Sequence, residues 1–220
     1  MTGAYDDLPA DLPVPVADGA AAHLVGAAVP EIRLPATTGG SVDLAELAAG
    51  RAVLYVYPMT GRPGVPLPAG WDAIPGARGC TPESIGFRDH AGELAELGVE
   101  VCGLSSQDPA DQRELAQRLD LSYPVLSDVR FALAEALRLP TFRAAGVRRY
   151  TRLTLVLAQG RIEHVFYPIF PTDSHAAEVA RWLRSEPSRT TGAGPASGPV
   201  SARVVSARPV GARSLEAGAR

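Results

Sequence analysis

The hydrophobic and polar positions of this 220-residue chain predict strands that alternate with helices. Continuous apolar, β-branched and aromatic runs at 52–58 and 99–105 are typical of strands buried on both faces of a sheet. Amphipathic patterns predict helices over 80–97 and after Asp108, which is the expected N-cap of a helix that begins with proline. The centre of the chain therefore indicates strands with helical crossovers.

Shorter patterns complete the expected order. The sequence predicts two short strands around a Gly-Gly turn near residue 40, a strand and helix within 123–139, a hairpin over 152–167 with Gln159-Gly160 at its turn, and a final helix capped by Thr172 or Asp173. Strands alternate with helices and an antiparallel hairpin closes the order. This order predicts an α/β domain with a mixed central sheet and helices on both faces.

Composition divides the chain into three parts. Residues 1–25 are acidic and Pro-rich, which predicts an N-terminal extension that is partly ordered at best, and 26–186 is the expected folded domain. Residues 187–220 combine small residues, Pro, Gly and five Arg, so we expect a disordered tail that cannot build a core.

Charge and hydropathy exclude several partners. The net charge of −3 gives no electrostatic footprint for nucleic acid. No apolar run approaches the roughly 20 residues needed to span a membrane, and the N-terminus lacks the basic and apolar regions of a secretory signal. We therefore expect a cytoplasmic protein whose thiols stay reduced.

The two cysteines occupy different kinds of position. Cys102 lies within a predicted buried strand, which indicates a structural thiol. Cys80 is a different case because it lies at a predicted helix start, where unpaired amides and the helix dipole stabilise a thiolate. The alternative is that Cys80 is only a small buried hydrophobe, but its position predicts a reactive thiol with a lowered pKa. The cysteines and four histidines lack zinc-ligand spacing, so no metal is expected.

The residues around Cys80 argue against several thiol chemistries. A Cys-x-x-Cys reductase motif would need a second cysteine where Glu83 stands, and a cysteine phosphatase loop would need arginine at Gly86. His90, a possible base for a hydrolase, would lie about three helical turns, roughly 15 Å, along the helix. A reaction that needs only a thiolate and hydrogen-bond donors remains, namely attack on a peroxide to give a sulfenic acid.

An ordered set of motifs resembles one family. The set consists of "AVLYVYP", "GCTPES" with "FRDH", "LGVEVCGLSSQD", "YPVLSD" and "RLTLVLAQGRI", and over 26–186 it resembles a peroxiredoxin of the bacterioferritin-comigratory or Q-type branch. The resemblance implies an elaborated thioredoxin-like fold. It also implies a thiol-dependent peroxidase that reduces hydrogen peroxide or organic hydroperoxides without a metal or organic cofactor.

The resemblance assigns roles to three residues. Cys80 matches the peroxidatic cysteine, and Arg152 in "RLTLVL" matches the strand arginine that holds the thiolate and polarises the peroxide. Glu83 matches the family position three residues after the cysteine. Cationic and amide donors at this place would lower the barrier because the leaving oxygen gains negative charge during O–O cleavage.

The sequence departs from the family pattern at several positions. The proline and the threonine or serine that usually precede the cysteine are replaced by Ala73 and Ala77, so Thr60 is the candidate to supply the missing hydroxyl. Thr60 follows the preceding strand, and the inserted loop after it covers a sheet end, shapes the mouth of the peroxide pocket or forms a thiol-donor site. Ile85 occupies the position of the resolving cysteine in many members, and Cys102 is predicted to be buried. The departures indicate a one-cysteine enzyme.

The cycle of such an enzyme needs an external reductant. The resemblance implies a small thiol or a thioredoxin- or glutaredoxin-like redoxin, and it leaves a homodimer open as the assembly. Two alternatives compete with the peroxidase. The first is a degenerate redoxin domain that serves as a binding module, which Ala77 favours. The second is a thiol-disulfide reductase or redox sensor that uses Cys80 without peroxide specificity.

Overall fold

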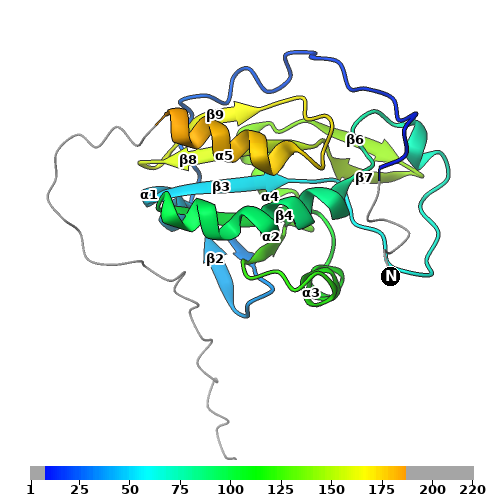
Figure 1. The fold of residues 1–220 in the computed structure, drawn as a ribbon, viewed down its shortest axis with the longest axis horizontal. Coiled ribbons are helices and arrows are strands. Elements are labelled where there is room, and N and C mark those ends of the chain that lie inside the picture. The colour runs from blue at the N-terminus through cyan, green and yellow to red at the C-terminus, as the bar shows by residue number, and fades with distance from the viewer. Residues whose placement is uncertain (1–7, 187–220) are drawn as a thin grey trace, which may run out of the picture.

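A five-stranded mixed sheet forms the centre of the protein (Figure 1). The computed structural model describes residues 8–186. The strand order is β5-β4-β3-β8-β9, in which β3, β4 and β5 are parallel and β8 and β9 are antiparallel additions. The strand bounds are β3 Arg51–Val56, β4 Val99–Ser105, β5 Val125–Ser127, β8 Leu153–Ala158 and β9 Arg161–Phe166.

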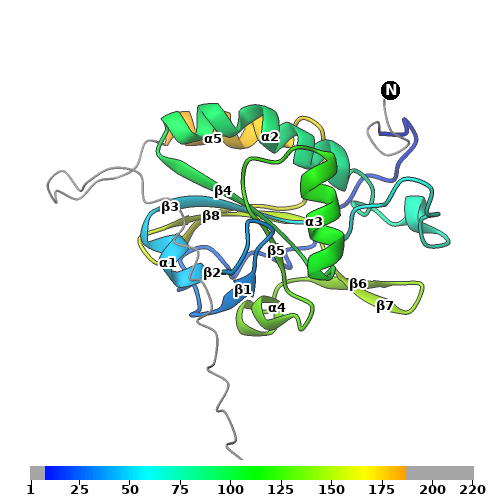
Figure 2. The same ribbon diagram turned by 90° about the horizontal axis from the view of Figure 1, so that it is seen from below.

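Helices cover both faces of this sheet (Figure 2). Helices α2 (Cys80–Glu96) and α5 (His175–Ser185) lie side by side on one face, and α3 (Pro109–Arg118) adds apolar residues to the same core. Helices α1 (Leu44–Ala49) and α4 (Ala132–Leu137) cover the other face. The predicted α/β class with a mixed sheet and helices on both faces is confirmed.

The alternation of side chains along the central strands separates two cores. Val53 and Tyr55 of β3 pack under α2 and α5, whereas Leu54 points to the core under α1 and α4. Strand β4 alternates in the same way, with Val101 on the α2 side and Cys102 on the α1 and α4 side. The sheet therefore stands between Cys102 and the start of α2.

Two local predictions are confirmed and one is wrong. The Asp108 side chain accepts hydrogen bonds from the first amides of α3, as expected of an N-cap. Gln159 and Gly160 both have positive φ angles, which a tight hairpin turn between β8 and β9 requires. Neither Thr172 nor Asp173 caps α5: Ser174 occupies that position without a side-chain hydrogen bond.

The sequence does not predict four short elements, namely one short helix, the two strands of a hairpin and a 3₁₀ turn. Strands β1 (Arg33–Pro35) and β2 (Ser41–Asp43) form the expected pair around the Gly-Gly turn, but the short helix α1 directly follows them. Strands β6 (Thr141–Ala144) and β7 (Val147–Tyr150) form a separate antiparallel hairpin at one end of the molecule (Figure 1). A 3₁₀ turn at Trp71–Ala73 interrupts the long loop before α2.

The core begins earlier in the chain than residue 26. Leu24 is fully buried under the sheet, and the Gly26 amide donates to the Ile162 carbonyl of β9 at 2.8 Å. The predicted disorder of 187–220 concerns residues outside the described part of the chain. Within residues 8–186, no helix is long and apolar enough to cross a membrane.

Candidate active site

Cys80 is the first residue of α2, as the sequence predicts. Gly79 precedes it with a φ angle of 96°, in the left-handed region that favours glycine. A Cβ atom at Gly79 would lie 2.0 Å from Thr172 Oγ1 and 2.8 Å from the Leu8 side chain. Only glycine therefore fits at this turn, where the chain places the Cys80 thiol on the N-terminal end of a 17-residue helix.

Arg152, directly before β8, reaches across to this turn. Its Nη2 donates to Cys80 Sγ at 3.0 Å and to the Arg78 carbonyl at 3.0 Å, while Nε donates to the Gly76 carbonyl at 3.2 Å. The Arg152 side chain is almost completely buried. One planar guanidinium therefore fixes the backbone of the loop before Cys80 and contacts the sulfur at the same time.

Glu83 lies one helical turn after Cys80 and forms a buried ion pair with Arg152. Burial raises the pKa of the Glu83 carboxyl, whereas the charges of Arg152 and His175 oppose that shift. Its Oε1 atom is buried and has no hydrogen-bond partner among the described residues. The structure thus links Cys80, Arg152 and Glu83 by direct contacts with the guanidinium.

The expected low pKa of Cys80 is wrong. The thiol is only 3 % exposed, and burial raises its pKa above the ordinary value. Arg152 and a backbone hydrogen bond from Met59 lower the pKa, but Glu83 raises it further. The sequence suggests only the helix start and nearby arginines, and the desolvation of the sulfur outweighs both. Consistent with a protonated resting thiol, Sγ donates to the Ala77 carbonyl at 3.6 Å.

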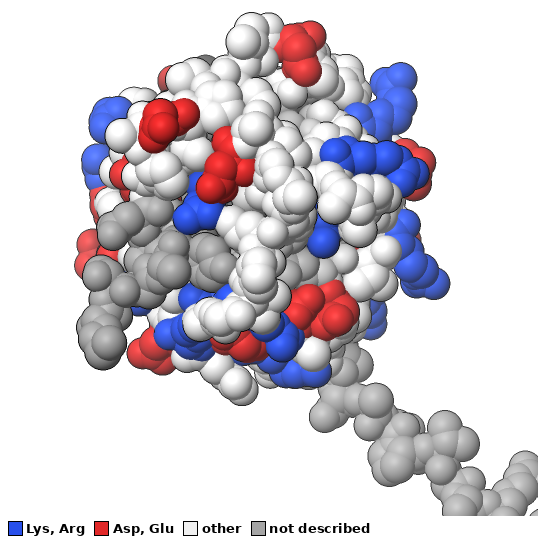
Figure 3. All heavy atoms as spheres, turned by 90° about the vertical axis from the view of Figure 1, so that its right-hand side faces the viewer, with Lys and Arg blue, Asp and Glu red and all other residues white. Residues whose placement is uncertain are grey.

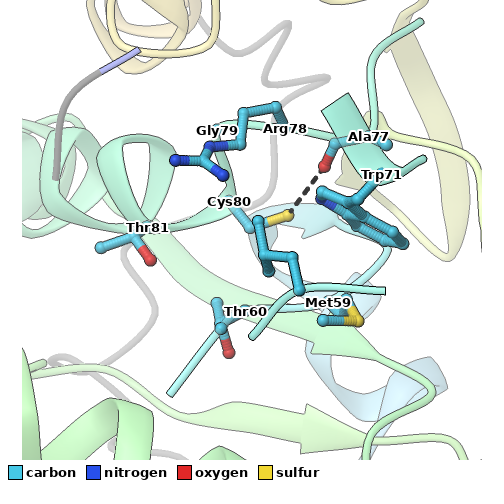
Figure 4. A pocket seen from close by; sticks show the side chains of 10 residues that line it. Met59, Thr60, Trp71, Ala77, Arg78, Gly79, Cys80 and Thr81 are labelled. Carbon is cyan, nitrogen blue, oxygen red and sulfur yellow. Dashed lines mark hydrogen bonds between the residues drawn. The ribbon is translucent and has the colours of Figure 1, made fainter. Parts of the chain in front are cut away.

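Thr60 lines the same pocket as Cys80 (Figure 4). Its hydroxyl donates to Gln107 Oε1 at 3.2 Å, and Gln107 also bonds both backbone groups of Thr60. Gln107 was not singled out from the sequence, although it follows the end of β4 within the quoted "SSQD" segment. It fixes the chain turn that brings Thr60 back toward the cysteine. The Thr60 oxygen keeps its lone pairs as acceptors.

The pocket over Cys80 is small and mostly apolar on one side. Met59, Leu67 and Trp71 come from the long loop before α2, and Figure 4 shows the Trp71 ring beside the sulfur. Its cavity volume of about 10 Å³ is about the space of one water molecule. The inserted loop thus forms a wall of the pocket. A space of this volume admits only a very small group and excludes a bulky substrate from direct contact with the sulfur.

Cys102 takes no part in this site. It is 1 % exposed in β4 and belongs to the core on the opposite face of the sheet, and burial raises its pKa. Both cysteines are free thiols. Among residues 8–186, no group of three or more His, Cys, Asp or Glu side chains is arranged to hold a metal ion.

Comparisons with known proteins agree with this geometry. The family model described as Redoxin matches residues 24–180. Peroxiredoxin Bcp of Escherichia coli (strain K12) is 29% identical over 163 residues, covering 72% of this chain and 94% of that protein. Peroxiredoxin Q of the chloroplast of Gentiana triflora is 26% identical over 161 residues, covering 73% of this chain and 66% of that protein.

Solved structures share the fold. The crystal structure of Peroxidoxin BcpB from Mycobacterium tuberculosis has a TM-score of 0.60 at 28% sequence identity, covering 74% of this chain and 97% of that one. A Peroxiredoxin Q structure from Xanthomonas campestris has a TM-score of 0.57 at 20% identity, covering 80% and 96%. The matched model, the shared sequence and the shared fold place this chain in the Redoxin family, in the branch of the Bcp and Q-type peroxiredoxins.

Proposed function

We propose that this protein is a thiol-dependent peroxidase in which Cys80 attacks hydrogen peroxide or an organic hydroperoxide. One observation carries the proposal: Arg152 Nη2 lies 3.0 Å from Cys80 Sγ at the start of α2, beside a small pocket that Cys80 itself lines. The names of the related peroxiredoxins support the same reaction class. Arg152 and Glu83 are the other residues that we assign to the machinery, with Thr60 as an acceptor on the pocket wall.

The first half of the cycle oxidises the sulfur. The Cys80 thiolate attacks the distal oxygen of R–O–OH, an S–O bond forms, and the O–O bond breaks. The sulfur becomes a sulfenic acid, and the leaving oxygen departs as RO⁻, which takes one proton to give an alcohol or water. The Arg152 guanidinium stabilises the thiolate and the charge that develops on the peroxide oxygens, because it acts in a site without bulk water.

The protons of this step balance within the site. Burial favours the protonated Cys80 thiol, so the resting cysteine gives up its proton as it attacks. The leaving oxygen needs one proton at the end of the same step. A transfer from the thiol to the leaving oxygen closes the balance without an outside base, and we assign Thr60 to accept a hydrogen bond from the peroxide O–H during it.

An external thiol completes the cycle. Ile85 stands in the family's resolving position, and Cys102 lies across the sheet from Cys80, so we assign a one-cysteine cycle. A small thiol or a thioredoxin- or glutaredoxin-like redoxin attacks the sulfenic acid and releases water. A second thiol then frees Cys80 from the mixed disulfide. The cytoplasm expected from the sequence would supply such thiols.

Stopped-flow consumption of hydrogen peroxide, with an excess of dithiothreitol, tests the proposal. The wild type and Cys102→Ser should consume peroxide at similar rates, whereas Cys80→Ser should be inactive. Cys102→Ser is the matched control because it removes the other thiol on the far side of the sheet.

Two outcomes would overturn the proposal in different ways. A folded wild type that consumes no peroxide would favour the degenerate redoxin domain that acts as a binding module. A Cys80 that reacts with disulfides as fast as with peroxide would favour the reductase or redox sensor.

A further inference from the structure

The alternation of side chains along β7 places Arg149 on the face of the hairpin toward the pocket. Along β7, Arg148 and Tyr150 point to the α4 side, where they contact Glu135 and Asp128 respectively. Successive side chains of a strand point to opposite faces. Arg149 therefore lies on the other face of the β6–β7 hairpin.

The neighbours of Arg149 on that face belong to the wall of the pocket. Phe142 of β6 is its partner in the strand register. The Phe142 ring lies 6.0 Å from the ring of Trp71 and packs against the small cluster that includes Ala77. Trp71 and Ala77 both line the pocket over Cys80. Arg149 thus lies on the face of the hairpin that adjoins the Trp71 wall of the pocket.

Charge balance sets Arg149 apart from the other arginines near this mouth. Arg62 pairs with Asp111, Arg78 pairs with Asp72, and Arg152 pairs with Glu83. None of the ion pairs formed among residues 8–186 includes Arg149, and its Nε atom is buried without a hydrogen-bond partner.

The surroundings of Arg149 leave it short of negative charge. Burial lowers the pKa of the Arg149 guanidinium, and the charges of Asp111 and Cys80 act in the opposite direction. Both are therefore within electrostatic range, but Asp111 is already paired with Arg62. A partly desolvated guanidinium without a counter-ion gains most from an anion that the solvent or a substrate brings. Figure 3 shows this end of the molecule, where basic and acidic side chains are scattered among uncharged ones.

We propose that Arg149 forms a carboxylate subsite, which makes the enzyme favour organic hydroperoxides that carry an acid group. This inference rests on the proposed peroxidase function. The peroxide head group enters the small pocket over Cys80, the apolar body lies along Trp71 and Phe142, and the carboxylate binds Arg149. Hydrogen peroxide has neither body nor charge, so the subsite does not bind it.

The kinetic test compares a carboxylate-bearing hydroperoxide with its methyl ester. Arg149→Gln should lower kcat/KM for the acid by about ten-fold or more, because a charge-assisted bidentate contact is lost. The same variant should lower kcat/KM for the ester and for hydrogen peroxide by a smaller factor that is equal for the two, because any effect of the lost charge on Cys80 itself is common to all three peroxides. Arg148→Gln is the matched control, since it removes the neighbouring charge on the opposite face of the same strand.

A second readout does not depend on peroxide chemistry. Iodoacetate and iodoacetamide alkylate the same thiol but differ in charge, so the ratio of their rates at Cys80 reports the local potential. Arg149→Gln should lower the iodoacetate-to-iodoacetamide ratio, and Arg148→Gln should not. Equal losses for acid, ester and hydrogen peroxide, or an unchanged alkylation ratio, would overturn the subsite. A wild type that alkylates normally but reduces no peroxide would instead overturn the proposed function.

Discussion

Arg152 makes contacts that no other cationic side chain could reproduce. Its guanidinium donates to three backbone carbonyls of the loop before α2, to Glu83 and to the Cys80 sulfur. Lysine has one ammonium group, which cannot direct hydrogen bonds along these diverging lines. At the scale of single residues, the site therefore depends on the shape of this cation as much as on its charge.

Arg152→Lys should lower the rate of hydrogen peroxide reduction by about 10²-fold or more, the usual effect of losing an oriented donor to a developing oxyanion. The positive charge stays, so the loss would measure geometry. Arg161→Lys is a suitable control because Arg161 makes an exposed contact to a backbone carbonyl far from Cys80. Stopped-flow kinetics measure the rate of hydrogen peroxide consumption by the two variants. Equal rates in Arg152→Lys and the wild type would contradict the geometric role.

The rate of Cys80 alkylation should rise with pH and reach its midpoint above about 8.5, the ordinary pKa of a free thiol. The raised pKa means that the folded protein binds this proton more tightly than the unfolded chain does. The contribution of this bound proton to the free energy of unfolding is therefore fully present below the Cys80 pKa of the unfolded chain. It is lost as the pH rises through the Cys80 pKa of the folded protein. Iodoacetamide kinetics across pH measure the midpoint, and a midpoint below the ordinary thiol value would contradict this reading.

At the scale of elements, the sequence predicts what local patterns control. The run at 52–58 and the Asp108-Pro109 start specify β3 and α3 because apolar continuity and capping act within a few residues. The β6–β7 hairpin escapes prediction because its strands carry several arginines in place of an apolar alternation. Thr172 resembles a cap by composition, but its hydroxyl packs against Gly79 instead.

Gly79 in the turn before α2 has a positive φ angle, and a side chain there would also collide with Thr172. A matched pair of variants separates these two effects. Gly79→Ala adds a Cβ that meets Thr172, whereas Gly98→Ala adds one in open space, although both positions have positive φ angles. Gly98→Ala should destabilise the fold by about 1–2 kcal/mol, the cost of that backbone region for an L-residue.

Gly79→Ala should destabilise the fold by more than Gly98→Ala and should also slow peroxide reduction, because the displaced turn carries Cys80. Thermal unfolding and stopped-flow kinetics on both variants make the comparison. Equal losses of stability with unchanged kinetics in both would argue against the close packing at Gly79.

At the scale of the whole molecule, the sheet keeps the two thiols apart. Its order and the alternation along β4 place Cys102 with α1 and α4, while Cys80 lies with α2 and α5. The sequence predicts that Cys102 is buried, but the face on which it lies depends on strand register. The pKa of Cys80 and the position of Arg149 likewise depend on tertiary contacts, and no local pattern could specify them. The predicted disorder of 187–220 remains a sequence-based expectation.

The intact mass after one equivalent of hydrogen peroxide, without reductant, shows whether Cys80 stays a sulfenic acid or forms a disulfide with Cys102. A disulfide would need the two Cα atoms within about 7 Å and side chains aimed at each other, which the intervening sheet prevents. We expect a gain of one oxygen atom on Cys80, trapped by a dione reagent and absent in Cys80→Ser. A loss of two hydrogens without added oxygen, abolished in Cys102→Ser, would contradict it, as would an unchanged mass.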